Sequence, residues 1–183
     1  PRFLQAVASA AFAYAVMSFL MTATPINMHI IENYSLNKTG IVIQLHIVSM
    51  FLPSLITGNL LKKFGHSKII YGGVFFYTLT ILLSFLEPSF FNYLFSLVFL
   101  GIGWNFLYLS GTSLLILSYR KEEKFKAQGF NDILVFSIQA LASLSAGYML
   151  SMTSWKTMNL ITIPFLILIV CSSIRADLSK DSK

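Results

Sequence analysis

Long apolar runs alternate with short polar segments along the whole chain. Each run has close to the ~20 residues that a helix needs to cross a lipid bilayer. The runs predict transmembrane helices at residues 3–28, 40–61, 69–86, 90–117, 127–150 and 157–174, followed by a short cytoplasmic tail at 175–183. The segments between the runs are too short to form a separate soluble domain. The expected fold class is therefore all-α, a polytopic membrane protein with one bundle of six transmembrane helices.

The basic residues between the runs predict the orientation of this bundle. Only Lys38 and Lys156 fall on one side of the expected membrane. The other side carries Arg2, Lys62, Lys63, Lys68, Arg120, Lys121, Lys124, Lys126, Arg175, Lys180 and Lys183. Lys and Arg accumulate in short cytoplasmic loops, so the richer side is expected to be cytoplasmic. With six spans, both termini then lie in the cytoplasm, and the expected location is the cell (inner) membrane.

Composition excludes several other classes of protein. The chain is 56% hydrophobic and only 11% charged, so it lacks the polar residues that would coat a soluble core of this size. Three histidines and one cysteine, without an H-E-x-x-H motif, give no support to a metal site, a cofactor site or an intramembrane enzyme. We expect no enzymatic activity and no nucleic-acid partner, and the lipid bilayer is the first partner.

Three of the runs carry polar residues at helical spacing, so each presents a polar face. These faces are His46, Ser49, Pro53 and Thr57 in the second run; Gly101, Asn105, Tyr108 and Thr112, with Trp104 beside them, in the fourth; and Gln128, Asp132, Val135, Gln139 and Ser143 in the fifth. Hydrogen bonding between helices and the lining of an aqueous cavity both need this spacing, and both interpretations stay open. The third and sixth runs contain no ionisable residue and are expected to face lipid.

Two ionisable residues lie inside predicted helices. Asp132 is the only acidic one, and His46 is the only histidine. Ionisable groups are costly in a bilayer and therefore indicate functional sites. Asp132 is expected either to stabilise the start of its helix, or to contact a gate, or to couple transport to protons. His46 is expected either to be a hydrogen-bonded cavity residue or to titrate.

The segment between the second and third runs resembles a motif of the major facilitator superfamily, G-x-L-A-D-R-F-G-R-R. The residues that fit are Gly58, Leu60, Lys63, Phe64 and Gly65. Lys62 stands where the motif has its acidic residue, and His66 replaces the first arginine after the turn. Residues 21–25, 101–106 and 127–132 are also similar to the C-terminal six helices of bacterial members.

This resemblance implies a half of a twelve-helix protein, built as a 3+3 inverted repeat. In such a half the first and fourth helices line the cavity, the second and fifth gate it, and the third and sixth face lipid. Together with the polar faces, it yields the substrate-cavity candidates Met21, Thr24, His46, Trp104, Asn105 and Tyr108. The gate or coupling candidates are Gly58, Lys62, Lys63, Gly65, Asp132, Gln128 and Gln139.

The predicted function is half of a secondary active transporter that moves a small molecule by alternating access, driven by a cation gradient, with protons as the expected ion. Six helices alone leave the cavity open, so the expected partner is an N-terminal six-helix half or a second copy. The alternative is a non-transporting membrane scaffold, or an inactive fragment of a transporter.

Overall fold

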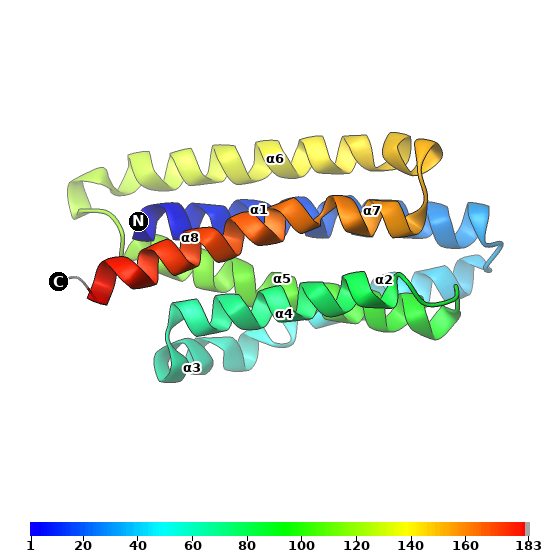
Figure 1. The fold of residues 1–183 in the computed structure, drawn as a ribbon, viewed down its shortest axis with the longest axis horizontal. Helices are drawn as coiled ribbons and strands as arrows, with labels where there is room; N and C mark the ends of the chain where they lie inside the picture. The colour runs from blue at the N-terminus through cyan, green and yellow to red at the C-terminus, as the bar shows by residue number, and fades with distance from the viewer. Residues whose placement is uncertain (182–183) are drawn as a thin grey trace.

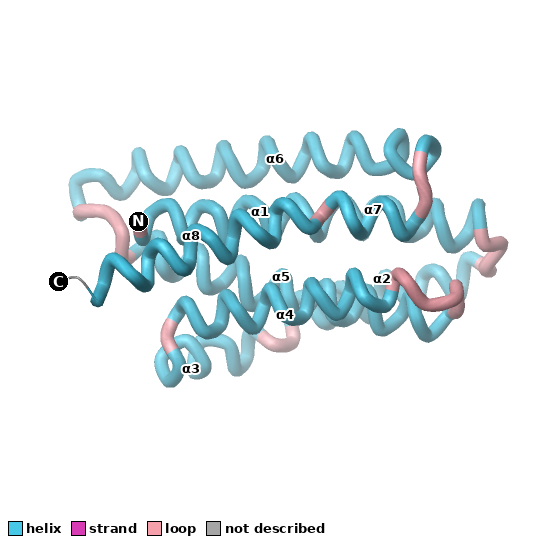
Figure 2. The backbone as a smooth tube through the Cα atoms, in the orientation of Figure 1, coloured by secondary structure: helices cyan, strands magenta, loops and turns pink. Residues whose placement is uncertain are grey.

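The computed structural model describes residues 1–181, and in that range all regular secondary structure is helical (Figure 1). The elements are α1 (Arg2–Pro25), the π-helix η1 (Ile26–Ile31), α2 (Leu36–Phe51), α3 (Ser54–Phe64), α4 (His66–Leu83), α5 (Phe90–Ile116), the short 3₁₀-helix η2 (Lys121–Glu123), α6 (Lys124–Met152), α7 (Trp155–Ile161) and α8 (Ile163–Asp181). The loops between them are short (Figure 2).

Five helical segments are long and apolar enough to cross a membrane, and α2 with α3 makes a sixth span that is bent by 40°. The all-α, multi-span membrane fold expected from the apolar runs is thus confirmed. The second span is broken around Pro53, which the resemblance to the major facilitator superfamily marks as a candidate bend. One detail differs from the sequence expectation: α8 continues to Asp181 through most of the segment expected to be a tail.

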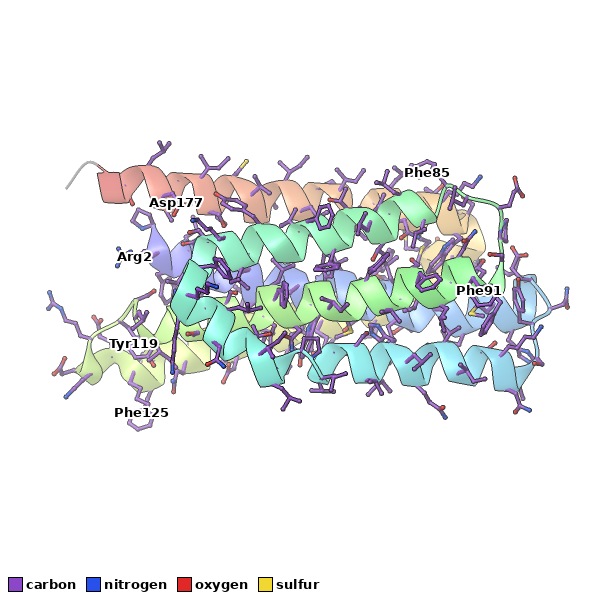
Figure 3. The ribbon with its side chains drawn as sticks, turned by 90° about the horizontal axis from the view of Figure 1, so that it is seen from below. Arg2, Phe85, Phe91, Tyr119, Phe125 and Asp177 are labelled. Atoms are coloured by element: carbon purple, nitrogen blue, oxygen red, sulfur yellow. The ribbon has the colours of Figure 1, made fainter. Side chains whose placement is uncertain are left out.

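Both termini lie at the same end of the bundle, together with the turn from α3 to α4 and the segment between α5 and α6 (Figure 1). Figure 3 places Arg2, Tyr119 and Phe125 at this end, and Phe85 and Phe91 at the opposite end. The even number of spans, with the broken pair counted as one, explains why the chain returns to the end from which it started.

The α5 helix packs closely on α1 and α2 because glycines remove side chains at the contacts. A Cβ at Gly101 would overlap the Ser49 hydroxyl oxygen of α2 and lie 2.8 Å from the carbonyl oxygen of His46. A Cβ at Gly111 would lie 2.7 Å from the carbonyl oxygen of Ala6 in α1. Small residues at such contacts let membrane helices approach until their backbones nearly touch.

A chain of polar contacts ties α1, α4 and α8 together at the end that holds the termini. Gln5 donates from Nε2 to the Ser67 hydroxyl at 3.0 Å, and that hydroxyl donates to Asp177 Oδ1 at 2.7 Å. Tyr71 donates to the other oxygen of Asp177 at 3.3 Å. Gln5 itself is buried. These contacts hold the first and last helices of the bundle on the same turn of α4.

The break in the second span is held by Asn105 of α5. Pro53 has no N–H, so it cannot continue the helical hydrogen bonds of α2. Asn105 donates from Nδ2 to the carbonyl oxygen of Met50 and to the Ser54 hydroxyl, both at 2.7 Å, and accepts from the Thr57 hydroxyl at 2.7 Å. One fully buried amide therefore bonds to residues before and after the bend.

The helices differ in how much of their surface is buried against other helices of this chain. In α1 with η1, 78% of the most apolar stretch is buried, whereas in the α6 span the share is 17%. The sequence predicted that the third and sixth spans face lipid, yet α6, which carries Asp132, has the smallest buried share of the five unbroken spans in the described residues.

Gly101→Ala is expected to destabilise the complete protein by about 1–3 kcal/mol, because the added methyl group overlaps Ser49. Gly40→Ala is the matched control, since a Cβ there meets nothing within 4 Å. Thermal denaturation of the two variants in detergent measures the difference. Equal stability of both variants would contradict the close contact between α2 and α5.

Asn105→Leu is expected to lower the stability of the complete protein by about 1–3 kcal/mol, because it leaves the buried carbonyl of Met50 without its donor and removes the bonds to the Ser54 and Thr57 hydroxyls. Asn92→Leu on the same helix is the control. Asn92 donates only to the carbonyl of Glu87, at an exposed position that water can reach. The same thermal assay applies, and a loss at Asn105 no greater than that at Asn92 contradicts the role assigned to the amide.

Candidate functional site

Five aromatic rings from four helices meet in the middle of the bundle. Trp104 and Tyr108 of α5 stack with ring centroids 5.0 Å apart and an angle of 15°. Tyr14 of α1 lies edge-on to both, at 5.1 Å and 4.9 Å. Phe51 of α2 contacts Trp104 at 5.9 Å, and Phe136 of α6 contacts Tyr14 at 6.0 Å. We call these five residues the aromatic cluster.

The cluster is buried at its centre and open at its sides. Trp104 is 4% exposed, whereas Phe51 is 59% and Phe136 is 53% exposed. The indole N–H of Trp104 is buried and has no hydrogen-bond partner. Buried polar groups normally have partners, and an indole nitrogen can only donate. The cluster therefore holds one unused hydrogen-bond donor.

A row of polar side chains on α6 lies beside the cluster. The carboxylate of Asp132 is exposed, and its Oδ1 accepts from Asn131 Nδ2 at 3.2 Å. Phe136 follows Asp132 by four residues, so both project from one face of the helix. Farther along this face Gln139 is half-buried, and the hydroxyls of Ser143 and Thr22 are 3.0 Å apart. The α1 and α6 helices are thus joined next to the cluster.

The structure places three of the six cavity candidates inside helix contacts. Asn105 uses its amide to hold the bend at Pro53, and the buried hydroxyl of Thr24 donates to the carbonyl of Leu20. His46 is fully buried, and its Nδ1 lies 2.7 Å from the carbonyl oxygen of Leu97, whereas Nε2 has no partner. Of the remaining three, Trp104 and Tyr108 belong to the aromatic cluster, and Met21 is half-buried.

The gate candidates lie mostly at the end that holds the termini. Gly65 ends α3 with a φ of 82°, a conformation that glycine adopts without strain. Lys62 and Lys63 before it are exposed. A Cβ at Gly58 would meet nothing within 4 Å, so no close helix contact forms at this glycine between the described residues. Gln128 donates to the hydroxyl of Tyr119 at 2.8 Å.

Sequence reasoning missed three members of the aromatic cluster. Tyr14 lies in an Ala-rich stretch, whose small residues are typical of close helix packing, and its isolation as the only tyrosine of α1 was the available signal. Phe51 and Phe136 carried no signal, because an exposed phenylalanine in a transmembrane helix is typical of lipid contact.

The arrangement supports non-covalent binding. It offers exposed rings at Phe51 and Phe136, an exposed carboxylate at Asp132, and the buried indole N–H of Trp104 between them. In the described part of the chain, no three His, Cys, Asp or Glu side chains are grouped so that they could hold a metal ion.

Comparison with known proteins identifies relatives along almost the whole chain. The sequence profile of the Major Facilitator Superfamily matches residues 6–179. The chain is 35% identical over 170 residues to the riboflavin transporter RfnT of Brucella anthropi, which covers 93% of this chain and 42% of that protein. It is 33% identical over 151 residues to the uncharacterised MFS-type transporter YddS of Bacillus subtilis (strain 168), which covers 81% of this chain and 34% of that protein.

No solved structure matches the chain. The chain spans less than half the length of the curated relatives. The profile match over residues 6–179 and the multi-span helical bundle together show that the chain belongs to the Major Facilitator Superfamily of membrane transporters.

Proposed function

We propose that this chain forms the C-terminal six-helix half of a secondary active transporter, which carries a small molecule across the cell (inner) membrane by alternating access. Both termini face the cytoplasm in this proposal. Lys and Arg are concentrated on one side of the expected membrane, which supports that orientation. The common end at which the two termini lie supports it as well (Figure 1).

The observation that carries the proposal is the exposed polar surface of the helices beside the aromatic cluster. Asp132 of α6, Gln44 of α2 and Asn59 of α3 are exposed although their helices are membrane spans. A carboxylate facing hydrocarbon is costly, so these groups need protein or water beside them. A second six-helix half, placed against α2, α3 and α6, supplies both: protein contacts at the rim and a water-filled cavity over the cluster.

Riboflavin is the first substrate to test. The relative from Brucella anthropi is named as a riboflavin transporter, and it is 35% identical to this chain over 170 residues. The match covers 93% of the chain, so the aligned segment contains the positions of all five residues of the aromatic cluster, from 14 to 136.

Protons are the proposed driving ion, and Asp132 is the proposed coupling residue. Its carboxylate is exposed, and it lies within electrostatic reach of Tyr108 in the aromatic cluster. One charge moved across about 100 mV releases ~2.3 kcal/mol, which supports roughly 50-fold accumulation of the substrate. A carboxylate that alternates between protonated and ionised forms links that energy to the cavity.

Expression of the complete protein in cells that cannot take up riboflavin tests the transport function. Uptake of radiolabelled riboflavin is expected to rise above that of empty-vector cells and to fall when a protonophore dissipates the gradient. Other solutes are screened in parallel as radiolabelled compounds. A protein that carries no solute under any gradient is a scaffold or an inactive fragment, and the proposed function is then wrong.

Asp132→Asn is expected to abolish uphill accumulation while exchange of labelled for unlabelled substrate continues, because the amide cannot bind or release the driving proton. Proteoliposomes with an imposed pH gradient measure both activities. Glu122→Gln is the matched control, since Glu122 is an exposed carboxylate of the short η2 helix that precedes α6. Accumulation by Asp132→Asn equal to that of the control variant contradicts coupling through Asp132.

A further inference from the structure

The stacked pair in the aromatic cluster leaves ring surface that no other ring uses. The centroids of Tyr14, Trp104 and Tyr108 are 4.9 to 5.1 Å apart in every pairing, so they form a nearly equilateral triangle. Tyr14 therefore lies beside the stacked pair instead of on top of it. Among the described residues no further ring contacts Tyr108, which is half-buried. The exposed part of Tyr108 is the place where another flat ring would extend the stack.

The unused N–H donor in the same cluster restricts which kinds of ring can bind there. The indole N–H of Trp104 is buried without a partner, although the residue is only 4% exposed. A ligand with a carbonyl or ring-nitrogen acceptor on its edge satisfies this donor, and a hydrocarbon ring does not. Phe51 contacts Trp104 and is 59% exposed, so it is the ring that can turn to admit this edge.

The aromatic rings near a carboxylate also resemble the arrangement that binds organic cations. The unused N–H of Trp104 argues against that occupant, because an N–H donor repels a cation and gains nothing from it. The carboxylate of Asp132, near Tyr108, can instead accept from the N–H or hydroxyl groups of a neutral ligand.

We propose that Tyr14, Trp104 and Tyr108 form the substrate-recognition site of this half, and that it selects planar heterocycles with a hydrogen-bond acceptor on the ring edge. This inference rests on the proposed transport function. Tyr108 supplies the stacking face, Tyr14 holds the pair from the side, and the Trp104 N–H binds the acceptor. Selection by ring faces requires a flat substrate, whereas the single N–H sets which edge of that substrate enters first.

Titration of riboflavin into the purified complete protein tests the site, because stacking on an indole or phenol ring quenches flavin fluorescence. Tyr108→Leu is expected to raise the Kd about tenfold or more, the usual effect of removing one aromatic stacking partner. Tyr108→Phe keeps the ring and is expected to stay within about threefold of the wild type on the same reasoning.

Trp104→Phe is the variant that separates stacking from hydrogen bonding. It keeps an aromatic ring in the core, so the fold survives, but it removes the N–H. The Kd for riboflavin is expected to rise about tenfold, the usual effect of losing one buried hydrogen bond to a ligand. Phe95→Leu is the control on the same helix: Phe95 is 48% exposed and contacts Phe91 and Phe99, away from the cluster.

Competition by other compounds decides between the possible occupants. Lumichrome, a flat tricyclic heterocycle with edge carbonyls and without the ribityl chain of riboflavin, is expected to displace riboflavin, and tetraethylammonium is not. Displacement by tetraethylammonium, or an unchanged Kd in both Tyr108→Leu and Trp104→Phe, overturns the inference.

The uptake screen distinguishes a failure of the recognition site from a failure of the proposed transport function. If the wild-type protein accumulates a non-planar solute but binds neither riboflavin nor lumichrome, the recognition site is wrong and the transport function stands. If it accumulates no solute at all, both are wrong. Binding of riboflavin that Trp104→Phe and Tyr108→Leu weaken, together with riboflavin uptake, supports both.

Discussion

The bend in the second span depends on one buried amide. Hydrocarbon offers no hydrogen bonds, so a broken helix inside a membrane persists only where side chains or water satisfy the freed backbone. Asn105 meets this requirement by bonding to Met50, Ser54 and Thr57 at once. The same three bonds set the rotation of α5 about its axis. In this rotation Trp104 contacts both Tyr14 of α1 and Phe51 at the end of α2, and Tyr108 contacts Tyr14.

Much of the fold could be predicted from sequence because the bilayer imposes a simple rule on length and polarity. Apolar runs identified all six spans, and Pro53 was a visible candidate for a bend. The face formed by His46, Ser49 and Thr57 is also real: all three residues are buried, and His46 and Thr57 bond to α5. Helical spacing predicted which residues share a face. It could not predict that this face is filled by another helix instead of by water.

The site was harder to predict, because its members differ in what they look like in a sequence. Asn105 and Trp104 are neighbours in the chain, yet one holds a helix bend and the other joins the aromatic cluster. Tyr14 comes from a helix with small residues, and only its distance to Trp104 in three dimensions reveals it. The exposure of α6 gives a second reason why the site was hard to predict. A surface that a second domain covers cannot be told from a lipid-facing one until polar groups such as Asp132 are seen on it.

The contacts of Gln5, Ser67 and Asp177 have a consequence for how this bundle comes apart. Chain ends usually fray first, because few contacts hold them. Here the first turns of α1 and the last turns of α8 are bonded to the same hydroxyl of α4. Neither terminal helix can separate from the bundle without disturbing the contacts of the other. The two ends of the polypeptide, far apart in sequence, therefore belong to one cooperative unit of unfolding.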